Sequence, residues 1–261
     1  MIELAERMGW LDFDCRYRLS EQVSVDVPLY RRVNQLALPD LLAYERQLVK
    51  LLIDKINAFP RPTTWIDCGA DIGILTALVA ADCLKLQEII ALEPNPLPLA
   101  YLQRNLAQLP FSSRALSSAA ADFQGRGTLA YSPRDSSDHS RYLAADENGD
   151  LDVVRIDDLG IAPGEPVALK IDVEGGELAV LRGARQTLAS ASEWVVALEA
   201  HRDVFRRTGI DPCECLRFLA SLGDIQATVA ECGEVELDST RPYFDQVSER
   251  ITNVVCHCSP R

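Results

Sequence analysis

Three carboxylates follow a short apolar segment in the second half of the chain. The segment A-L-K-I ends at Ile171, and Asp172, Glu174 and Glu177 lie within the next six positions. Carboxylates resist the loss of water and repel one another, so stability does not explain such a group at the end of a buried strand. A carboxylate can remove the proton of a hydroxyl group, and the pattern therefore predicts acid–base chemistry at this place.

A second apolar segment, W-V-V-A-L-E-A-H, also ends in groups that can carry protons. Alternation along a strand places Glu199 and His201 on the same side, where they could converge with Asp172 and Glu174. Two interpretations follow: direct proton transfer with His201 or an acid as the general base, or a divalent cation held by the acids and His201. We favour direct acid–base work and expect no bound metal, because the sequence contains no compact metal-binding motif.

Two further charged residues flank these acids. Lys170 lies within the first apolar segment. Two roles fit it: an ion pair with an acid at the strand end, or a contact with the substrate. Glu177 falls in the first turn of the helix expected next, where a carboxylate interacts favourably with the helix dipole. We assign Glu177 this capping role and keep Lys170 among the candidate catalytic residues.

A glycine-containing turn, D-C-G-A-D-I-G from Asp67 to Gly73, follows another apolar segment. Glycine lets a backbone approach a ligand without a Cβ in the way. Glu93 lies 26 residues after Asp67, where nucleotide-binding α/β folds hold the ribose hydroxyls with an acid. The turn departs from G-x-G-x-x-G, so it suits a ligand with a ribose and a positive charge, such as S-adenosylmethionine, better than a pyrophosphate. A plain strand-to-helix turn with a buried acid is the structural alternative.

Beyond Pro62, short apolar runs alternate with helical stretches, which is the βαβ pattern of a parallel sheet. Ligands bind at the carboxyl ends of the strands in such sheets, and the candidate acids follow predicted strands. The last two apolar runs fit an antiparallel finish. The predicted strands are residues 63–68, 88–93, 114–116, 128–132, 167–172, 193–199, 227–231 and 252–258, and the predicted helices are residues 74–83, 98–109, 176–188 and 212–223.

Two regions precede or interrupt this alternation. The first 60 residues lack strong strand patterns, and residues 38–56 have the periodicity of an amphipathic helix that begins after Pro39. Residues 117–150 are rich in glycine, serine and aspartate, which is typical of lids, binding loops or disorder. Two interpretations of this segment follow: a solvated loop, or a loop that faces the acceptor. In the second, Arg134 and Arg141 would suit an anionic or hydroxyl-rich acceptor.

The chain of 261 residues carries a formal net charge of −13, which argues against a nucleic-acid backbone as its main ligand. No apolar run reaches the roughly 18 residues of a membrane span, and acids occupy the N-terminus where a signal peptide would be basic. We therefore expect a cytoplasmic protein without membrane or nucleic-acid partners. The eight cysteines are expected to be reduced thiols, because a chain of this length does not need disulfides for stability. The spacing of Cys213/Cys215 and Cys256/Cys258 does not match a zinc site.

Three motifs resemble the FkbM family of S-adenosylmethionine-dependent methyltransferases. They are D-C-G-A-D-I-G from Asp67, E-P-N-P from Glu93, and K-I-D-V-E-G-G-E-L-A-V-L-R-G-A from Lys170. The third motif is the specific one, whereas the first two are typical of class I methyltransferases in general. The resemblance covers roughly residues 40–258, and Asp71, where the family more often has asparagine, is compatible with a positively charged cofactor.

The resemblance implies an α/β protein with the class I methyltransferase (Rossmann-like) fold, a mostly parallel seven-stranded sheet with helices on both faces. Together with the helical pattern before Pro62, we expect an N-terminal helical extension over residues 1–60 and a methyltransferase domain over residues 61–261. In this family S-adenosylmethionine lies with its methionine part over the glycine turn and its ribose at the acid after the second strand. Carried over residue by residue, the cofactor-binding set is Asp67, Gly69, Ala70, Gly73, Glu93, Asn95, Ala115 and Leu116, the last two near the adenine.

The implied activity is transfer of a methyl group to a hydroxyl oxygen of a saccharide or secondary-metabolite acceptor. Two other classes of protein are open: a non-catalytic binding protein that retains the fold, and a nicotinamide-dependent oxidoreductase. The intact Gly69, Gly73 and Glu93 count against the first, and the missing phosphate-binding glycine pattern counts against the second. The candidate catalytic set is Asp172, Glu174, His201, Lys170 and Glu199.

Overall fold

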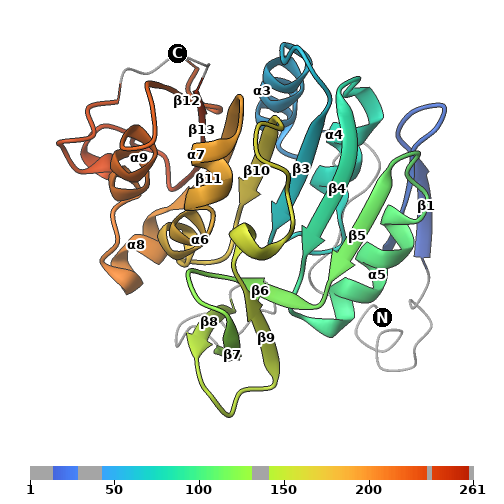
Figure 1. Cartoon of the computed structure of the whole chain (residues 1–261), viewed down its shortest axis with the longest axis horizontal. Helices are drawn as coiled ribbons and strands as arrows, with labels where there is room; N and C mark the ends of the chain where they lie inside the picture. Colours follow the sequence, from blue (N-terminus) through green and yellow to red (C-terminus); the bar gives the residue numbers. More distant parts are fainter. Residues whose placement is uncertain (1–13, 29–42, 131–140, 234–236, 259–261) are drawn as a thin grey trace, which may run out of the picture.

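A seven-stranded sheet forms the centre of the protein, seen in a computed structural model that describes residues 14–28, 43–130, 141–233 and 237–258. Its strand order is β12-β13-β11-β10-β3-β4-β5, and β13 runs antiparallel to the other six strands (Figure 1). The predicted mostly parallel seven-stranded sheet with an antiparallel finish is therefore confirmed. The strands are β3 (Thr63–Cys68), β4 (Leu86–Leu92), β5 (Ser112–Leu116), β10 (Val167–Ile171), β11 (Trp194–His201), β12 (Ile225–Val229) and β13 (Ile251–Cys258).

The strands at the centre of this sheet are buried on both faces, as a parallel sheet covered by helices requires. Every residue of β3 and of β10 is buried. Lys170 on β10 pairs in register with Asp67 on β3 and with Ala197 on β11. The carboxyl ends of these three strands therefore meet at one edge of the sheet, which is where the sequence places the candidate acids.

Two hydrophobic cores lie on opposite faces of the sheet, because successive strand residues point to opposite sides. Trp65 belongs to the core that α3, α4 and α5 cover, and Ile66 belongs to the core that α6, α7 and α9 cover. Helices on both faces are thus confirmed. The helix predicted over residues 176–188 is interrupted at Ala184, and α8 was not predicted. The helices are α3 (Arg46–Asn57), α4 (Ile74–Asp82), α5 (Pro96–Leu106), α6 (Glu177–Gly183), α7 (Arg185–Ser190), α8 (Arg202–Thr208) and α9 (Pro212–Ala220).

A second, four-stranded sheet occupies the region that the sequence indicated to be mostly irregular. Its order is β6-β9-β7-β8, and it lies below the carboxyl edge of the main sheet in Figure 1. Close backbone packing explains part of the glycine content, since a Cβ at Gly149 would overlap the backbone of Gly127 on β7. The strands are β6 (Ser118–Ala120), β7 (Gly125–Ala130), β8 (Tyr142–Ala145) and β9 (Leu151–Val154).

The N-terminal extension is not wholly helical, which corrects the expectation for residues 1–60. An antiparallel hairpin of β1 (Asp14–Arg18) and β2 (Ser24–Pro28) precedes α3, and Asn105 on α5 hydrogen-bonds the backbone N–H and carbonyl of Asp26. Valines of β2 share a core with α3 and Trp65, so packing continues across residue 60. The domain boundary at residues 60 and 61 stays a prediction.

None of the helices in the described ranges is long and apolar enough to span a bilayer.

Candidate active site

A cavity of about 630 Å³ lies at the carboxyl edge of the main sheet, with the small sheet as its opposite wall. Loops after β3, β4 and β10, the end of β11 and residues of β6, β7 and β8 line it. The lining includes six of the predicted site residues, namely Gly69, Glu93, Asn95, Asp172, Glu174 and Glu199. It does not include the other seven, namely Asp67, Ala70, Gly73, Ala115, Leu116, Lys170 and His201.

Gly69 lies where the loops after β3 and β10 touch. Its φ is +76°, and a Cβ built there would overlap the carbonyl oxygen of Asp172. Lys170 Nζ donates a hydrogen bond of 2.8 Å to the Gly69 carbonyl oxygen. Only glycine fits both this backbone conformation and this close approach. The predicted glycine turn and the predicted acidic segment are therefore parts of one structure.

Asp67 and Gly73 shape the turn from beneath the cavity. The Asp67 side chain is 1% exposed, accepts a 2.6 Å hydrogen bond from Thr76 Oγ1 and lies 3.4 Å from Lys170 Nζ. Burial raises the pKa of Asp67, while Lys170 and Thr76 oppose that rise. Gly73, with φ +84°, is the N-cap of α4 and packs against Leu102. Both residues therefore support the turn without lining the cavity.

Glu93 presents its carboxylate to the cavity from the end of β4. Its two oxygens accept hydrogen bonds from the backbone N–H groups of Asp71 at 2.9 Å and Asn95 at 2.8 Å. Burial raises the pKa of Glu93 to about 7, and the two N–H groups limit that rise. Asp71 itself has a left-handed φ of +49°, and Asn95 caps α5 through Leu97 N. Glu93 is thus held in place with lone pairs left for a ligand.

The wall beyond β5 is shifted along the chain from its predicted position. Ala115 and Leu116 lie on β5 and do not reach the cavity, whereas Ser118 to Ala121 and Phe123 line it. The sequence signal that could have located this wall is the run of small residues S-S-A-A-A at 117–121. Small side chains leave space beside the strand end, and Phe123 adds an aromatic surface.

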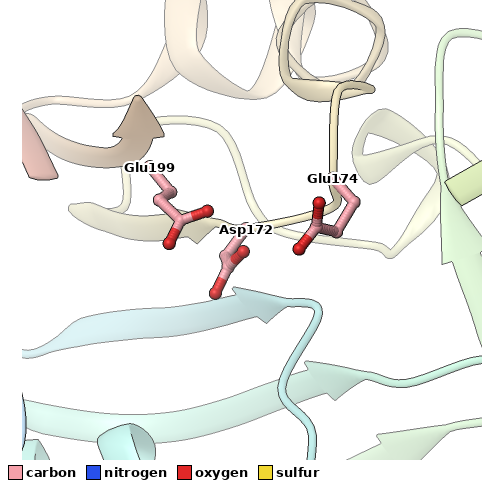
Figure 2. Close-up of side chains that lie close together, drawn as sticks. All are labelled: Asp172, Glu174 and Glu199. Atoms are coloured by element: carbon pink, nitrogen blue, oxygen red, sulfur yellow. The ribbon is translucent and has the colours of Figure 1, made fainter. Parts of the chain in front are cut away.

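Three acids converge on the cavity from neighbouring strand ends. Asp172, Glu174 and Glu199 each offer a carboxylate oxygen, and these oxygens lie within 4.8 Å of one another (Figure 2). Burial, followed by the charges of Asp172 and Glu174, raises the pKa of Glu199 well above its usual value. Carboxylates this close cannot all be ionised at low cost, so the group retains a proton at neutral pH.

Lys170 lies beside one of these acids, Asp172. Its Nζ lies 3.3 Å from Asp172 Oδ2 and 3.4 Å from Asp67 Oδ1. Burial alone would lower the pKa of Lys170, but the charges of Asp172 and Asp67 raise it well above its usual value. Lys170 therefore stays cationic and pairs with a strand-end acid, one of the two roles that the sequence left open.

His201 does not converge with the acids on this cavity. It lies at the end of β11, where α8 begins, and lines a separate cavity of about 20 Å³ together with Glu199 and Glu177. Burial lowers the pKa of His201. Strand alternation places Glu199 and His201 on one side as predicted, but His201 faces the small cavity, which residues of α8 and α9 also line. Of the residues that the structure describes, only Glu199 lines both cavities.

Glu177 begins α6, and its carboxylate accepts a 2.9 Å hydrogen bond from Gly175 N. Burial raises its pKa. This geometry agrees with a role at the helix start. Gly183, later in the same motif, allows α6 to contact the backbone of Ala121, since a Cβ there would overlap the Ala121 carbonyl oxygen.

The three acids are also the set of oxygen donors that a divalent cation would use. Among the described residues, no other group of three metal-binding side chains lies so close together, and His201 is not part of this one. None of the eight cysteines forms a disulfide, and Cys213, Cys215 and Cys256 are buried. Their arrangement gives no zinc site in the parts of the chain that the structure describes.

Further cavity residues come from segments that sequence analysis left without a specific role. Tyr44 of the N-terminal extension lines the cavity, as do Leu129, Arg141 and Leu143 of the small sheet and its edge. Arg141 was noted as suited to an acceptor, whereas Arg134 lies outside the described residues. Glu45, beside Tyr44, has a left-handed φ of +43°, and burial raises its pKa to about 7.

A model of the FkbM methyltransferase domain matches residues 67–235. The chain belongs to this family. The FkbM match contains the glycine turn, Glu93 and all three converging acids, and S-adenosylmethionine is the cofactor that FkbM membership implies. The seven-stranded sheet is the class I methyltransferase fold expected of an FkbM protein. A comparison with curated proteins finds none that matches this sequence.

Several solved structures are similar to this FkbM chain. Methyltransferase FkbM from Methylobacillus flagellatus KT is 20% identical, with a TM-score of 0.47, and the match covers 75% of this chain and 43% of that one. This chain thus spans less than half of that protein. TYW2 from M. jannaschii in complex with AdoMet is 12% identical, with coverage of 94% and 85% and a TM-score of 0.47. A SAM-dependent methyltransferase from Agrobacterium tumefaciens is 10% identical, with coverage of 95% and 70% and a TM-score of 0.49.

Proposed function

We propose that this protein transfers the methyl group of S-adenosylmethionine to a hydroxyl oxygen of a saccharide or secondary-metabolite acceptor. The observation that carries the proposal is the convergence of Asp172, Glu174 and Glu199 on the cavity that Gly69 and Glu93 also line. The glycine turn and Glu93 supply the cofactor side of such a site. The acids supply groups that can take the proton which a hydroxyl loses on methylation.

The residues present fit the cofactor. Gly69 offers backbone without a side chain for the methionine part, and the Glu93 carboxylate offers acceptors for ribose hydroxyls. The small-residue wall from Ser118 to Ala121 lies where the adenine would extend. The cavity volume of about 630 Å³ falls within the usual range for small-molecule sites. When bound, the cofactor supplies an electrophilic methyl group beside several negative charges, which suit its sulfonium.

Asp172 is the general base in this proposal. It directly follows β10 and touches Gly69 through its backbone, so it lies nearest to the part of the cavity assigned to methionine. Lys170, whose Nζ lies 3.3 Å from Asp172 Oδ2, orients the carboxylate. Glu199 retains a proton and can donate a hydrogen bond to the acceptor, while Glu174 completes the polar wall. The protein thus aligns the acceptor hydroxyl and removes its proton as the new bond forms.

Calorimetric titration with S-adenosylmethionine and, separately, with NAD tests the cofactor half of the proposal. We expect saturable heat from S-adenosylmethionine and none from NAD. Saturation by NAD alone would support the oxidoreductase, and the absence of heat from S-adenosylmethionine would overturn the proposal. The acceptor half is tested by incubation with methyl-labelled cofactor and fractionated host extract, followed by identification of the labelled product. Label on a nitrogen or carbon atom would contradict transfer to oxygen.

A further inference from the structure

We propose that Arg207 on α8 is a positioning residue of this site, which fixes Glu174 and ties the acidic wall of the cavity to the small sheet. The inference rests on the proposed function, because Glu174 is one of the three converging acids. Arg207 itself does not line the cavity. Its proposed effect on the reaction is therefore exerted through the residues that it holds.

Arg207 contacts both the backbone and the side chain of Glu174. Arg207 Nη2 donates a hydrogen bond to the Glu174 carbonyl oxygen and lies 3.8 Å from Glu174 Oε2. The two side chains are only 21% and 23% exposed, so water screens their interaction less than at an open surface. Glu174 has a left-handed φ of +57°, which is uncommon for a residue with a side chain. A hydrogen bond to its carbonyl helps to maintain that conformation.

The rest of α8 packs onto the same loop. A Cβ at Gly175 would lie 2.8 Å from Thr208 Cγ2 and 3.0 Å from Val204 Cγ1. Val204, Arg207 and Thr208 are three and four positions apart and therefore share one face of the helix. The loop that carries Glu174 thus packs against this face of α8, and Arg207 is the charged residue on that face.

Arg207 also contacts the small sheet. Its guanidinium carbon lies 4.8 Å from the centroid of the Tyr142 ring, within the range of a cation–π interaction. Tyr142 is the first residue of β8, between Arg141 and Leu143, which both line the cavity. One planar guanidinium therefore joins Glu174 on one wall to the strand that forms the other wall. Lysine has no planar group that could stack on the ring and donate at its edge.

The position of Glu174 relative to the small sheet determines how an acceptor between them is aligned. A displacement of about 1 Å in such a site costs on the order of 100-fold in rate. Loss of Arg207 should therefore slow methyl transfer. It should leave cofactor binding nearly unchanged, because Gly69 and Glu93 lie on the loops after β3 and β4.

The kinetic test compares Arg207→Met with Arg206→Met, a control on the same helix whose arginine is 63% exposed and pairs with Asp203. With the acceptor fraction identified by labelling, we expect Arg207→Met to lower kcat by about 10- to 100-fold and to change the Kd of S-adenosylmethionine by less than about threefold. Arg207→Lys should recover part of the loss. Equal kcat values for the Met variants, or a parallel loss of cofactor affinity, would overturn the inference.

A double-mutant cycle with Glu174→Gln separates positioning from general structural support. If Arg207 acts through Glu174, Arg207→Met should cost less than about threefold in the Glu174→Gln background. A full and additive loss in both backgrounds would show that Arg207 does not act through the Glu174 carboxylate.

Hydrogen exchange provides a measurement that needs no acceptor. Arg207→Met should speed amide exchange in residues 173–176 and 142–145, whereas Arg206→Met should leave both segments as in the parent protein. Unchanged exchange in both segments of Arg207→Met would overturn the inference. Failure of the proposed function would instead appear as no methyl transfer by the parent protein, and the exchange result would still decide the role of Arg207.

Discussion

The carbonyl oxygen of Asp172 occupies the space that a side chain at Gly69 would need. Two motifs about 100 residues apart in the sequence therefore meet at backbone level, with Lys170 donating to the Gly69 carbonyl across the same contact. This contact fixes the cofactor turn against the loop of the candidate base. It leads directly to a prediction about the smallest substitution at that position.

Gly69→Ala should abolish measurable binding of S-adenosylmethionine and lower the free energy of unfolding by about 2 kcal/mol or more. The added Cβ must displace the Asp172 loop, and φ of +76° is unfavourable for alanine. Gly160→Ala is the matched control, because Gly160 has φ of +81° but no atom within 4 Å of the position that a Cβ would take. Calorimetry and chemical denaturation measure the two effects. Similar behaviour of both variants would contradict the role of the contact.

Asp172→Asn should lower kcat by about 100-fold or more, because an amide cannot accept the hydroxyl proton. Affinity for S-adenosylmethionine should change little, since Gly69 and Glu93 are untouched. His201→Ala, by contrast, should retain most of the activity, because this side chain lines the small cavity and not the main one. Steady-state kinetics and calorimetry check both variants. Greater loss from His201→Ala than from Asp172→Asn would reassign the base.

Glu45→Gln should make stability less dependent on pH. Burial raises the pKa of Glu45 from an ordinary value of 4.5 to about 7, so the folded state binds more protons than the unfolded state between these values. The contribution of Glu45 to the free energy of unfolding therefore falls as pH rises through this window. The variant should match the parent protein below pH 4.5 and exceed it at pH 8. Denaturation curves at several pH values measure this.

The difference between variant and parent is the informative quantity in that experiment. Burial lowers the pKa of His201 and His257, which makes stability rise with pH near their ordinary value of 6.5. This opposite trend partly masks the effect of Glu45 in the parent protein alone. Parallel curves for the variant and the parent across the whole range would refute the assignment.

Removal of divalent cations should leave methyl transfer unchanged. In the proposed mechanism Asp172 receives the proton directly, with Lys170 as its counter-charge at 3.3 Å. The assay is performed with and without a chelator, after dialysis of the enzyme against it. Loss of activity with recovery on addition of Mg²⁺ would instead make Asp172, Glu174 and Glu199 metal ligands, which their spacing within 4.8 Å permits.

The central strands of the main sheet could be predicted from sequence because they are buried on both faces. β10 is an apolar run except for Lys170, and β3 combines Trp65, Ile66 and Cys68 with β-branched threonines. Such runs are informative without any knowledge of their neighbours. Gly69, Glu93 and Asp172 were located for a related reason: each lies at the end of such a run. Position at a strand end is a local property, and it is also what brings these residues to one cavity.

The remaining features depend on contacts between distant segments. The strands of the small sheet are short and partly exposed, so their composition resembles that of a loop. β1 alternates exposed and half-buried residues and is stabilised by pairing with β2. His201 was placed at the main cavity because strand alternation does not reveal the separate small cavity that α8 and α9 form beside it. Arg207 carries no local signal, since its role is defined by Glu174 and Tyr142.

Among the described residues, the non-glycine positions with positive φ are Glu45, Asp71 and Glu174. Glycine would relieve the backbone at each of them, yet each is an acid in or beside the cavity. Replacement of Asp71 or Glu174 by glycine should therefore relieve the backbone but remove an acid that lines the cavity. Selection of this chain for thermostability alone would select against its own chemistry at these two positions.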